Sequence, residues 1–585
     1  MGGVSARDIS TARPPDPREE FPAASVEDWR EAAAQSLAGR RLDDLTVEHC
    51  PGVAVRPLYT EQDLPALSGE PGRTPFARGT GATAHPAAGW RACQRCDHPD
   101  PAEAGRWVAE AARRDVSCAW LVFDAAARRG LDAADPASAA LAVDGVVTSS
   151  AADLGPVLEA IAAAGTAVHL DGGGNGIALA AAAAAARQLR GAPAGALDGS
   201  LGWDPLAALA SDGALPYGLE RSLDLLADVV SWTVRHGPAL HAVRVSTLPY
   251  HMAGASAVQE LACAIATGVE YLRRTTAAGV ELEAACRRLG FLAPIGRDLP
   301  IEIAKLRALR VMWARVVEAS GGSEQAQAAT VHAVTSPRCL TRRDPWVNML
   351  RATVGAFAGI AGGADILTVL PFDGAIGLPD SFGRRIAANL HTILREESHL
   401  GRVADPAGGS YAIERLTRDL ADAGWAAFQA IERSGGIAAA LLGGGLRREL
   451  AESARRRDEE LRSGRSPITG VTSHPDPAER PLERPVATRA DVSVRAAAAA
   501  GGAPGAGLAA ALEAVARAAD AARGDGSVLE SAIAALAAGA SVGAVAAAVR
   551  GAGEPAAIPP LPAARDAAAF EDLRGPGLSP EAGGG

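Results

Sequence analysis

The sequence predicts an α/β protein whose main part is a (β/α)8 TIM barrel, with an N-terminal arm and a helical C-terminal linker extension. From about residue 58 to residue 400, short β-rich runs alternate with helical stretches. This repeated order predicts parallel strands, because each right-handed crossover between parallel strands needs a helix. The length of the alternating region fits a closed barrel better than an open doubly wound sheet.

The arm, residues 1–57, begins with a polar, Pro-rich stretch. We expect a helix from Val26 to Leu37, followed by a strand and a turn over residues 45–60. The arm has no core of its own, so we expect it to pack on the barrel or on a partner. A frayed terminus is the alternative for its first ~20 residues.

Within the barrel region, 58–400, strands are expected at 118–124, 144–149, 167–173, 241–247 and 366–370. Helices are expected at Ala151–Ala164, Ile177–Leu189, Leu219–His236, Glu302–Ala319 and Arg384–Glu396. Loops that follow the C-terminal ends of barrel strands carry the chemistry, so we expect Asp373 and Gly374 at the barrel mouth. A helical linker is expected over 401–484, and a low-complexity Ala/Gly-rich segment with short remnant helices over 485–585.

Composition limits the function classes. A chain of 585 residues with 48% hydrophobic content is too long for one ordinary core. Its formal net charge of −11 argues against nucleic acid or an anionic membrane as a partner. Apolar runs stay below the ~20 residues of a membrane-spanning helix. Seven cysteines and an N-terminus without a signal segment favour a cytoplasmic location.

Six blocks carry a resemblance: VRPLYT at 55–60, PFARG at 75–79, YHMAGASAVQELA at 250–262, EIAKLRALRVMWA at 302–314, HAVTSPRCLTRRDPW at 332–346, and the stretch 365–417. With these blocks in this order, the chain resembles the cobalamin-dependent acyl-CoA mutases, methylmalonyl-CoA mutase above all. The segment ESHLGRVADPAGGSY at 397–411 is similar to the corresponding sequence of the small, non-catalytic subunit of that family.

The resemblance implies a barrel whose axis admits the pantetheine arm of coenzyme A. It also implies a C-terminal domain that brings adenosylcobalamin through the histidine of a DxHxxG motif. None of the eleven histidines stands in that motif. The most similar segment, Glu397 to Gly401, has glutamate in place of the aspartate, and its glycine follows the histidine at the wrong spacing. We therefore expect the Rossmann-like cobalamin domain to be absent after 570–574, and the cofactor to belong to a partner subunit.

Several positions of the implied substrate site are degenerate. Gly374 stands where catalytic subunits carry a glutamate that holds the adenosine ribose, and Val334 replaces the glutamine of an HxQ loop whose His332 remains. Asp212 lies near the place of the arginine that pairs with the substrate carboxylate. An ungapped match puts Arg95 at the catalytic tyrosine, and puts the tunnel contacts at Gly81, Ala84, Ala88 and Arg91. We expect the barrel axis to be plugged, with Arg91 and Arg95 along its entry wall.

Tyr250 and His251 repeat the tyrosine–histidine pair of the active subunits, whose histidine donates to the thioester carbonyl. Aligning the following AGAS without a gap instead places Leu248 and Pro249 over that pair. His251 is then catalytic in the first alignment and structural in the second, and the structural alternative is favoured.

Two other motifs have weaker functional interpretations. Cys93, Cys96 and His98 offer three zinc-type ligands but no fourth, so we expect no metal site. The run His169–Gly176 follows a strand and precedes a helix, which favours a tight βα turn over a phosphate cradle.

The resemblance and these departures from it predict the small, non-catalytic subunit of a heterodimeric methylmalonyl-CoA mutase, which assists a large catalytic subunit in interconverting (R)-methylmalonyl-CoA and succinyl-CoA. One alternative is an active acyl-CoA mutase barrel that uses a separate cobalamin-binding subunit. A mutase-associated scaffold is the other.

Overall fold

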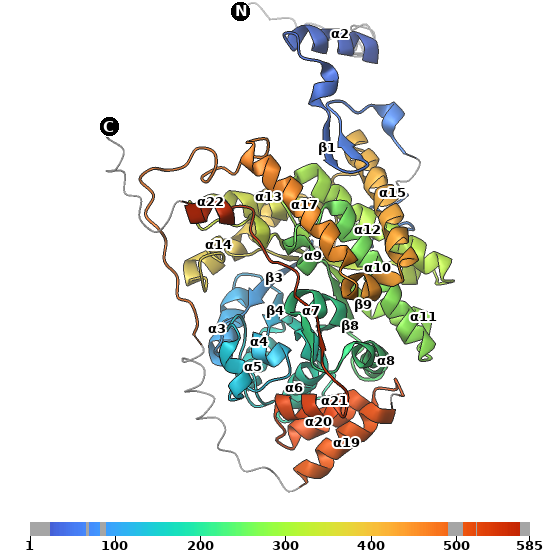
Figure 1. Ribbon diagram of the computed structural model, residues 1–585, viewed down its shortest axis with the longest axis vertical. Coiled ribbons are helices and arrows are strands. Elements are labelled where there is room, and N and C mark those ends of the chain that lie inside the picture. The colour runs from blue at the N-terminus through green and yellow to red at the C-terminus, as the bar shows by residue number, and fades with distance from the viewer. Residues whose placement is uncertain (1–23, 66–68, 82–88, 489–506, 522, 574–585) are drawn as a thin grey trace, which may run out of the picture. The chain divides into compact units, whose positions relative to one another are not determined.

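The computed structural model describes residues 24–65, 69–81, 89–488, 507–521 and 523–573 (Figure 1). The chain divides into two compact units, residues 1–59 and 60–585. In the first, α2 (Val26–Ser36) begins at a capping box between Ser25 and Asp28, and β1 (Val47–Cys50) pairs with β2 (Val53–Val55) as a hairpin. The expected helix of the arm is confirmed, and the expected strand and turn form this hairpin.

The second unit contains a closed barrel of eight parallel strands, which confirms the predicted fold class. The strands follow each other around the barrel in chain order, and the last pairs with the first. They are β3 (Arg91–Cys96), β4 (Cys118–Val122), β5 (Ala167–Asp171), β6 (Gly199–Trp203), β8 (Leu240–Ser246), β9 (Leu289–Ile295), β10 (Thr330–Thr335) and β11 (Ile366–Thr368).

Four of the five expected strands are present, and the strand expected at 144–149 is wrong. That segment makes a single bridge, between Val146 and Phe123, at the end of β4. A Cβ on Gly145 would lie 2.5 Å from the Phe123 backbone, so only glycine fits at this crossing. The strands β3, β6, β9 and β10 were not predicted.

Helices cover the outside of the barrel and extend beyond it (Figure 1). The longer helices between the strands are α3 (Pro101–Ala112), α5 (Gly155–Ala164), α6 (Gly176–Gln188), α8 (Leu219–His236), α10 (Ala257–Ala277), α12 (Leu299–Ala319) and α13 (Val347–Ala361), and α14 (Ser381–Thr392) follows the last strand. Shorter ones are α4 (Ala125–Arg128), α7 (Pro205–Asp212), α9 (Leu248–Met252) and α11 (Leu282–Arg287). No helix in the described ranges is long and apolar enough to span a bilayer.

The alanine-rich α6 shows why small residues suit this fold. All its residues from Gly176 to Ala186 are buried, because short side chains let the helix approach the barrel closely. A Cβ on Gly176 would lie 2.3 Å from the Trp203 ring of β6. The large indole therefore fills the space that the small helix residues leave.

The PFARG and DPAGG blocks meet at one buried carboxylate. Asp405 accepts from Arg78 Nε at 2.8 Å and also pairs with Arg307 of α12. Arg307 in turn lies 2.7 Å from Glu414 of α15 (Tyr411–Arg433). A Cβ on Gly408 would fall 2.3 Å from the Asp405 carboxylate, so glycine is required there. These blocks hold the outer helices onto the barrel.

The C-terminal part returns to the barrel. The helices are α16 (Gly436–Leu442), α17 (Gly445–Arg462), α19 (Leu508–Ala521), α20 (Ser527–Ala537), α21 (Val542–Arg550) and α22 (Ala568–Leu573). The two short helices expected at 527–549 are confirmed, whereas α19 was not predicted. Asp228 of α8 accepts from the backbone N–H groups of Val528 and Leu529, which ties α20 to the barrel layer.

Residues 551–567, here called the strap, run from α21 to α22 in front of α7 (Figure 1). Within the strap, β12 (Ala556–Ala557) pairs antiparallel with β7 (Ala214–Leu215). Further on, Leu561 N donates to Ala210 O at 2.7 Å, Ala564 N to Met252 O at 3.1 Å, and Asp566 N to Arg338 O at 3.0 Å. The strap therefore crosses the loops that follow β6, β8 and β10, at the C-terminal end of the barrel.

Candidate functional site

Tyr250 and His251 lie on α9, directly after β8, and both are buried. The parts of this segment that line the mouth of the barrel are Leu248, Pro249 and Met252 instead. Tyr250 and His251 therefore face away from the mouth, into the layer between the barrel and its helices. This geometry matches the alignment that puts Leu248 and Pro249 at the positions of the family's catalytic pair.

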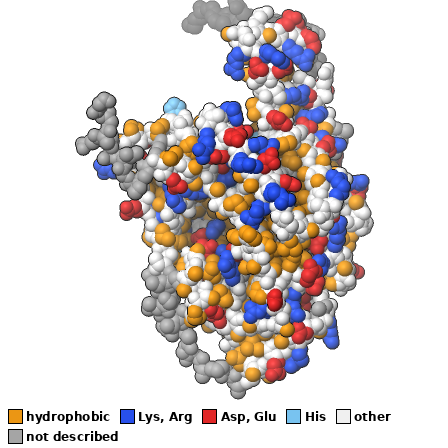
Figure 2. Space-filling view, viewed as in Figure 1, with side chains coloured by type: hydrophobic (Ala, Val, Ile, Leu, Met, Phe, Trp, Pro, Cys, Tyr) orange, Lys and Arg blue, Asp and Glu red, His pale blue; other side chains and the backbone are white. Residues whose placement is uncertain are grey.

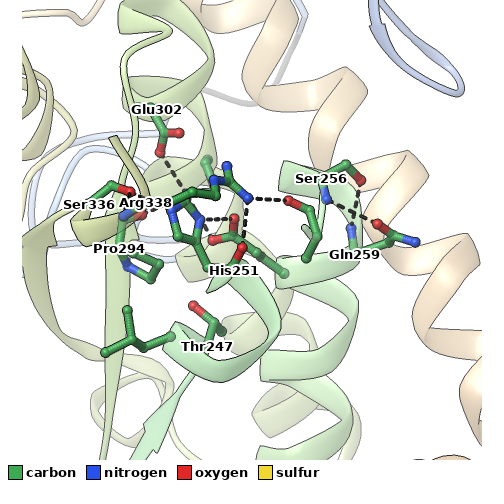
Figure 3. A network of polar contacts seen from close by, with 12 residues as sticks. Thr247, His251, Ser256, Gln259, Pro294, Glu302, Ser336 and Arg338 are labelled. Atoms are coloured by element: carbon green, nitrogen blue, oxygen red, sulfur yellow. Dashed lines mark hydrogen bonds and ion pairs between the residues drawn. The ribbon is translucent and has the colours of Figure 1, made fainter. Parts of the chain in front are cut away.

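His251 is the centre of a closed polar network (Figure 3). Its Nδ1 lies 2.7 Å from Glu260 Oε1, and its Nε2 lies 2.6 Å from Ser336 Oγ. Arg338 Nη1 donates to the His251 carbonyl at 2.7 Å, which fixes the backbone of α9 as well. Both ring nitrogens are thus bonded within the protein.

Lys305 of α12 completes the network. Its ammonium lies 2.9 Å from Glu260, 2.6 Å from Glu302 and 2.7 Å from the Pro294 carbonyl. Burial works to raise the pKa of Glu260, but Lys305 and His251 outweigh it and lower that pKa to about 2. Burial lowers the pKa of His251 to about 4, so its imidazole is neutral near pH 7. The network ties α9, α10 and α12 to β9 and the loop after β10.

A second polar cluster fills the barrel axis around Trp120 of β4. The guanidinium groups of Arg95 from β3 and Arg244 from β8 lie 5.3 and 5.2 Å from the Trp120 ring. His332 from β10 meets the same ring edge-on at 5.9 Å, and His169 from β5 lies 5.2 Å from the His332 ring. These distances are typical of cation–π and aromatic pairs, so the interior is a packed stack.

The HxQ positions lie on this interior surface. His332 Nε2 is 2.8 Å from Thr368 Oγ1, and burial lowers the pKa of His332 well below its usual value. Val334 belongs to the apolar interior with Cys93 and Leu370.

Gly374 and Asp373 follow β11, as the sequence predicts, but they differ in environment. Gly374 is exposed in a turn, and its backbone N–H donates to the Pro371 carbonyl at 3.0 Å. Asp373 is fully buried and accepts from Arg484 Nε at 2.5 Å. The segment that precedes residue 489 therefore holds the loop after β11 in place.

A cavity of about 290 Å³ lies at the C-terminal mouth of the barrel, under the strap. Its polar wall consists of Arg95, Arg128, Asp144, Asp171, Asp204, Ser211, Asp212, Arg244 and Ser246. Asp212 does lie here, but Arg128 donates to it at 3.1 Å from Nε, and to Asp144 at 3.0 Å from Nη2. An acid at this place would repel a substrate carboxylate, and its pairing with Arg128 weakens that repulsion.

Arg91 lies at the opposite end of the barrel from the mouth. It begins β3 and pairs with Asp198 at 2.8 Å. Arg95 lies at the mouth, where its Nε donates to the Asp97 carboxylate at 2.7 Å. Of the two arginines expected along one entry wall, only Arg95 touches the mouth cavity. Ala84 and Ala88 lie outside the described residues.

The two weaker motifs have structural roles. Cys93 faces the barrel interior, while the Cys96 thiol bonds the Gln94 carbonyl. No group of three metal-ligating residues occurs in the described part of the chain. The glycine-rich run forms a tight turn, in which buried Asn175 donates to Ala127 O at 2.8 Å.

The sequence analysis did not predict Trp120 of the axis cluster, nor several residues of the mouth cavity, among them Asp204 and Arg244. A usable signal existed for Arg244: the run HAVRVST places Ala242, Arg244 and Ser246 on one face of a strand by period two. An arginine between two small residues on the inward face of a barrel strand indicates that the barrel interior is polar at that level. For Asp204 the run DPLAALA is typical of a helix N-cap followed by Pro at N1, but this signal does not indicate that the residue lines the mouth.

The fold and its sequence blocks define a barrel of the acyl-CoA mutase class. The chain matches the methylmalonyl-CoA mutase family over residues 48–554. It is 40% identical to a methylmalonyl-CoA mutase small subunit of Streptomyces virginiae, over 80% of this chain and 74% of the relative. It is 34% identical to the small subunit of Propionibacterium freudenreichii subsp. shermanii, over 79% and 70% of the two chains. A methylmalonyl-CoA mutase of Escherichia coli (strain K12) is 31% identical over 81% and 70%. The chain belongs to the methylmalonyl-CoA mutase family.

Proposed function

We propose that this chain is the small, non-catalytic subunit of a heterodimeric, adenosylcobalamin-dependent methylmalonyl-CoA mutase in the cytoplasm. The large subunit carries the cofactor and interconverts (R)-methylmalonyl-CoA and succinyl-CoA. The relatives from Streptomyces virginiae and Propionibacterium freudenreichii, both named small subunits, support this assignment.

One observation carries the proposal: the imidazole expected to touch the thioester is bonded inside the protein. His251 is fully buried and uses both ring nitrogens on Glu260 and Ser336. Leu248 and Pro249, which line the mouth in its place, have no side-chain donor. An acyl-CoA carbonyl at this mouth would meet no general acid from α9.

The filled axis supports the same function. A pantetheine arm would have to displace the stack of Arg95, Trp120 and Arg244, and would lose their mutual contacts. The described mouth also does not fit adenosylcobalamin. His169 and His332 are 4% and 2% exposed and pack against each other, so neither is presented to a cofactor above the barrel.

The test is co-expression with a methylmalonyl-CoA mutase large subunit, followed by size-exclusion chromatography and activity assay. We expect a stable heterodimer whose activity needs the large subunit's cobalamin site. Calorimetry of the isolated chain should detect succinyl-CoA binding no tighter than millimolar, and a visible-spectrum titration should detect no histidine-bound cobalamin.

Micromolar succinyl-CoA binding would contradict the proposal and support the active-barrel alternative. A complex that forms during maturation and then dissociates would support a scaffold instead.

A further inference from the structure

Two neighbouring helices of the barrel layer, α13 and α14, present apolar side chains to solvent (Figure 1). Of the fourteen large hydrophobic side chains that are exposed in the described residues, five lie along these two helices. Their spacing follows the helix period, so each helix carries one stripe on its outer side. We call these five residues the apolar face: Trp346, Leu350, Val354, Phe382 and Ile393.

Aromatic contacts hold one end of the apolar face in place. The Trp346 ring stacks on the buried Phe372 ring at 5.0 Å between centroids, and it meets the Phe382 ring edge-on at 6.5 Å. The guanidinium of Arg385 lies 5.2 Å from the Phe382 ring. Tryptophan and arginine dominate the energy of protein–protein contacts, and side chains that are already ordered lose little entropy on binding. The apolar face therefore has the composition of a protein-binding surface.

Opposite charges stand at the two ends of the stripe on α14. Arg385 lies in its first turns, and Glu396 and Glu397 lie in the π-helical turn Ile393–Glu397 that continues it. The three side chains are exposed, and none forms an ion pair with another described residue. They are about three helical turns apart, so they lie on the same side of the helix as the apolar stripe.

This charge pattern makes the apolar face complementary to itself. A two-fold axis that crosses the face at right angles to the helices would set α14 of one copy antiparallel to α14 of the other. Arg385 of each copy would then meet Glu396 and Glu397 of its partner, and the apolar stripes would meet between them. A second copy of the chain thus supplies every group that the face requires.

The size of the face sets the strength of the contact. The helices have 15 and 12 residues, which makes them about 22 and 18 Å long, and packed helix axes lie ~8–10 Å apart. The face is therefore roughly 20 Å by 20 Å, and two copies would bury on the order of 1,000 Å² together. Interfaces of this area belong to weak, reversible complexes rather than to permanent ones.

We propose that two copies of this chain associate reversibly through the apolar face, as an antiparallel two-fold dimer. The inference goes beyond the proposed function, because it concerns contact between two small subunits and needs no large subunit.

Sedimentation equilibrium of the isolated full chain at ~1–200 µM tests the proposal, with an expected dissociation constant of ~10–100 µM. Leu350→Glu puts a carboxylate in the middle of the apolar face and should weaken dimerisation at least ~10-fold. Leu189→Glu is the matched control, because Leu189 is 55% exposed at the end of α6, outside the face. It should leave dimerisation unchanged.

Charge variants identify the second copy as the occupant. Arg385→Glu leaves acids at both ends of the stripe, and the double variant Glu396→Arg, Glu397→Arg leaves cations at both ends. Each variant alone should dimerise at least ~10-fold more weakly than the unaltered chain, because like charges meet across the axis. An equal mixture of the two variants should associate again, since every contact then joins opposite charges.

A chain that stays monomeric at ~200 µM would overturn the proposal, as would a dimer that Leu350→Glu leaves intact. A mixture of the charge variants that does not associate would overturn it as well. If Leu350→Glu instead abolished binding of the large subunit, the face would belong to the heterodimer and the assignment to a second copy would be wrong.

Discussion

Two buried polar clusters meet at β8 and at α9, which follows it, and they differ in completeness. In the His251 network, the imidazole uses both nitrogens and Lys305 meets two carboxylates and a carbonyl. In the cluster at the barrel axis, Arg244 has two nitrogens and His169 both ring nitrogens without a described partner. A closed network holds the fold through satisfied hydrogen bonds, whereas the axis cluster is held by cation–π and ring contacts and leaves buried nitrogens unsatisfied.

The two clusters draw differently on the family blocks. The block YHMAGASAVQELA contributes His251 and Glu260 to the closed network. The open cluster takes His332 from the block at 332–346, but Trp120 and Arg244 belong to no family block. Over the face seen in Figure 2, acidic and basic side chains are interspersed, so no single-sign patch dominates it.

The largest expected effect is on the closed network. Lys305→Met should lower the free energy of unfolding by ~3–5 kcal/mol, because it leaves Glu260 and Glu302 buried without their cation. Urea denaturation followed by circular dichroism measures it. Arg315→Met, on the same helix but in an exposed pair with Glu318, should change stability by less than ~1 kcal/mol. Equal losses in the two variants would show that the network is not closed.

Acidification should destabilise the fold through its buried neutral histidines. Burial lowers the pKa of His251 and of His241 to about 4. The unfolded chain takes up protons at its ordinary histidine pKa near 6.5, so stability is lost as pH falls from about 6.5 to about 4. His251 alone accounts for a loss on the order of 3 kcal/mol, at about 1.36 kcal/mol per pKa unit.

Two buried acids oppose this trend. Burial raises the pKa of Asp204 and Asp228 to about 6, so their protonation favours the folded state as pH falls from about 6 to 3.8. Because the buried histidines outnumber them, we expect lower stability at pH 5 than at pH 7 in urea titrations. Replacing His251 by Gln should flatten this pH dependence, and an unchanged slope would mean that His251 is protonated in the folded protein.

His251→Ala is expected to cost less, about 1–3 kcal/mol, since it leaves Glu260 and Ser336 without one partner each. Turnover per assembled heterodimer should stay the same, so total activity follows the abundance of the complex. A hundredfold lower turnover per complex, equivalent to about 2.7 kcal/mol of transition-state stabilisation, would make the histidine catalytic.

Part of this architecture was predictable because it depends on local pattern. Runs such as CAWLVF and ILTVL indicate buried strands, and the helices of 219–236 and 302–319 carry a clear period. The strand β6, GSLGW, was missed because Gly199 and Gly202 adopt positive φ angles that no strand propensity predicts. Val146 has strand-like neighbours, yet it forms only an isolated bridge with Phe123, which the local pattern does not predict.

The site itself was less predictable, because it depends on contacts between distant segments. Lys305 lies in a helical block whose pattern gives no reason for a buried ammonium; its partners come from α10 and from its own preceding turn. Leu561 closes the mouth from more than three hundred residues beyond Arg244, in a segment without a strand pattern. Such pairings follow from tertiary structure and leave no local signal.

The smallest expected effect sharpens the comparison at the open cluster. Asp97 holds Arg95 Nε at 2.7 Å, and the two side chains are 20% and 28% exposed. Asp97→Asn should change the free energy of unfolding by less than ~1 kcal/mol, because partly exposed pairs contribute little. Urea denaturation followed by circular dichroism measures the change. A loss of ~3 kcal/mol or more would mean that the Asp97 carboxylate holds the axis cluster as firmly as Lys305 holds the closed network.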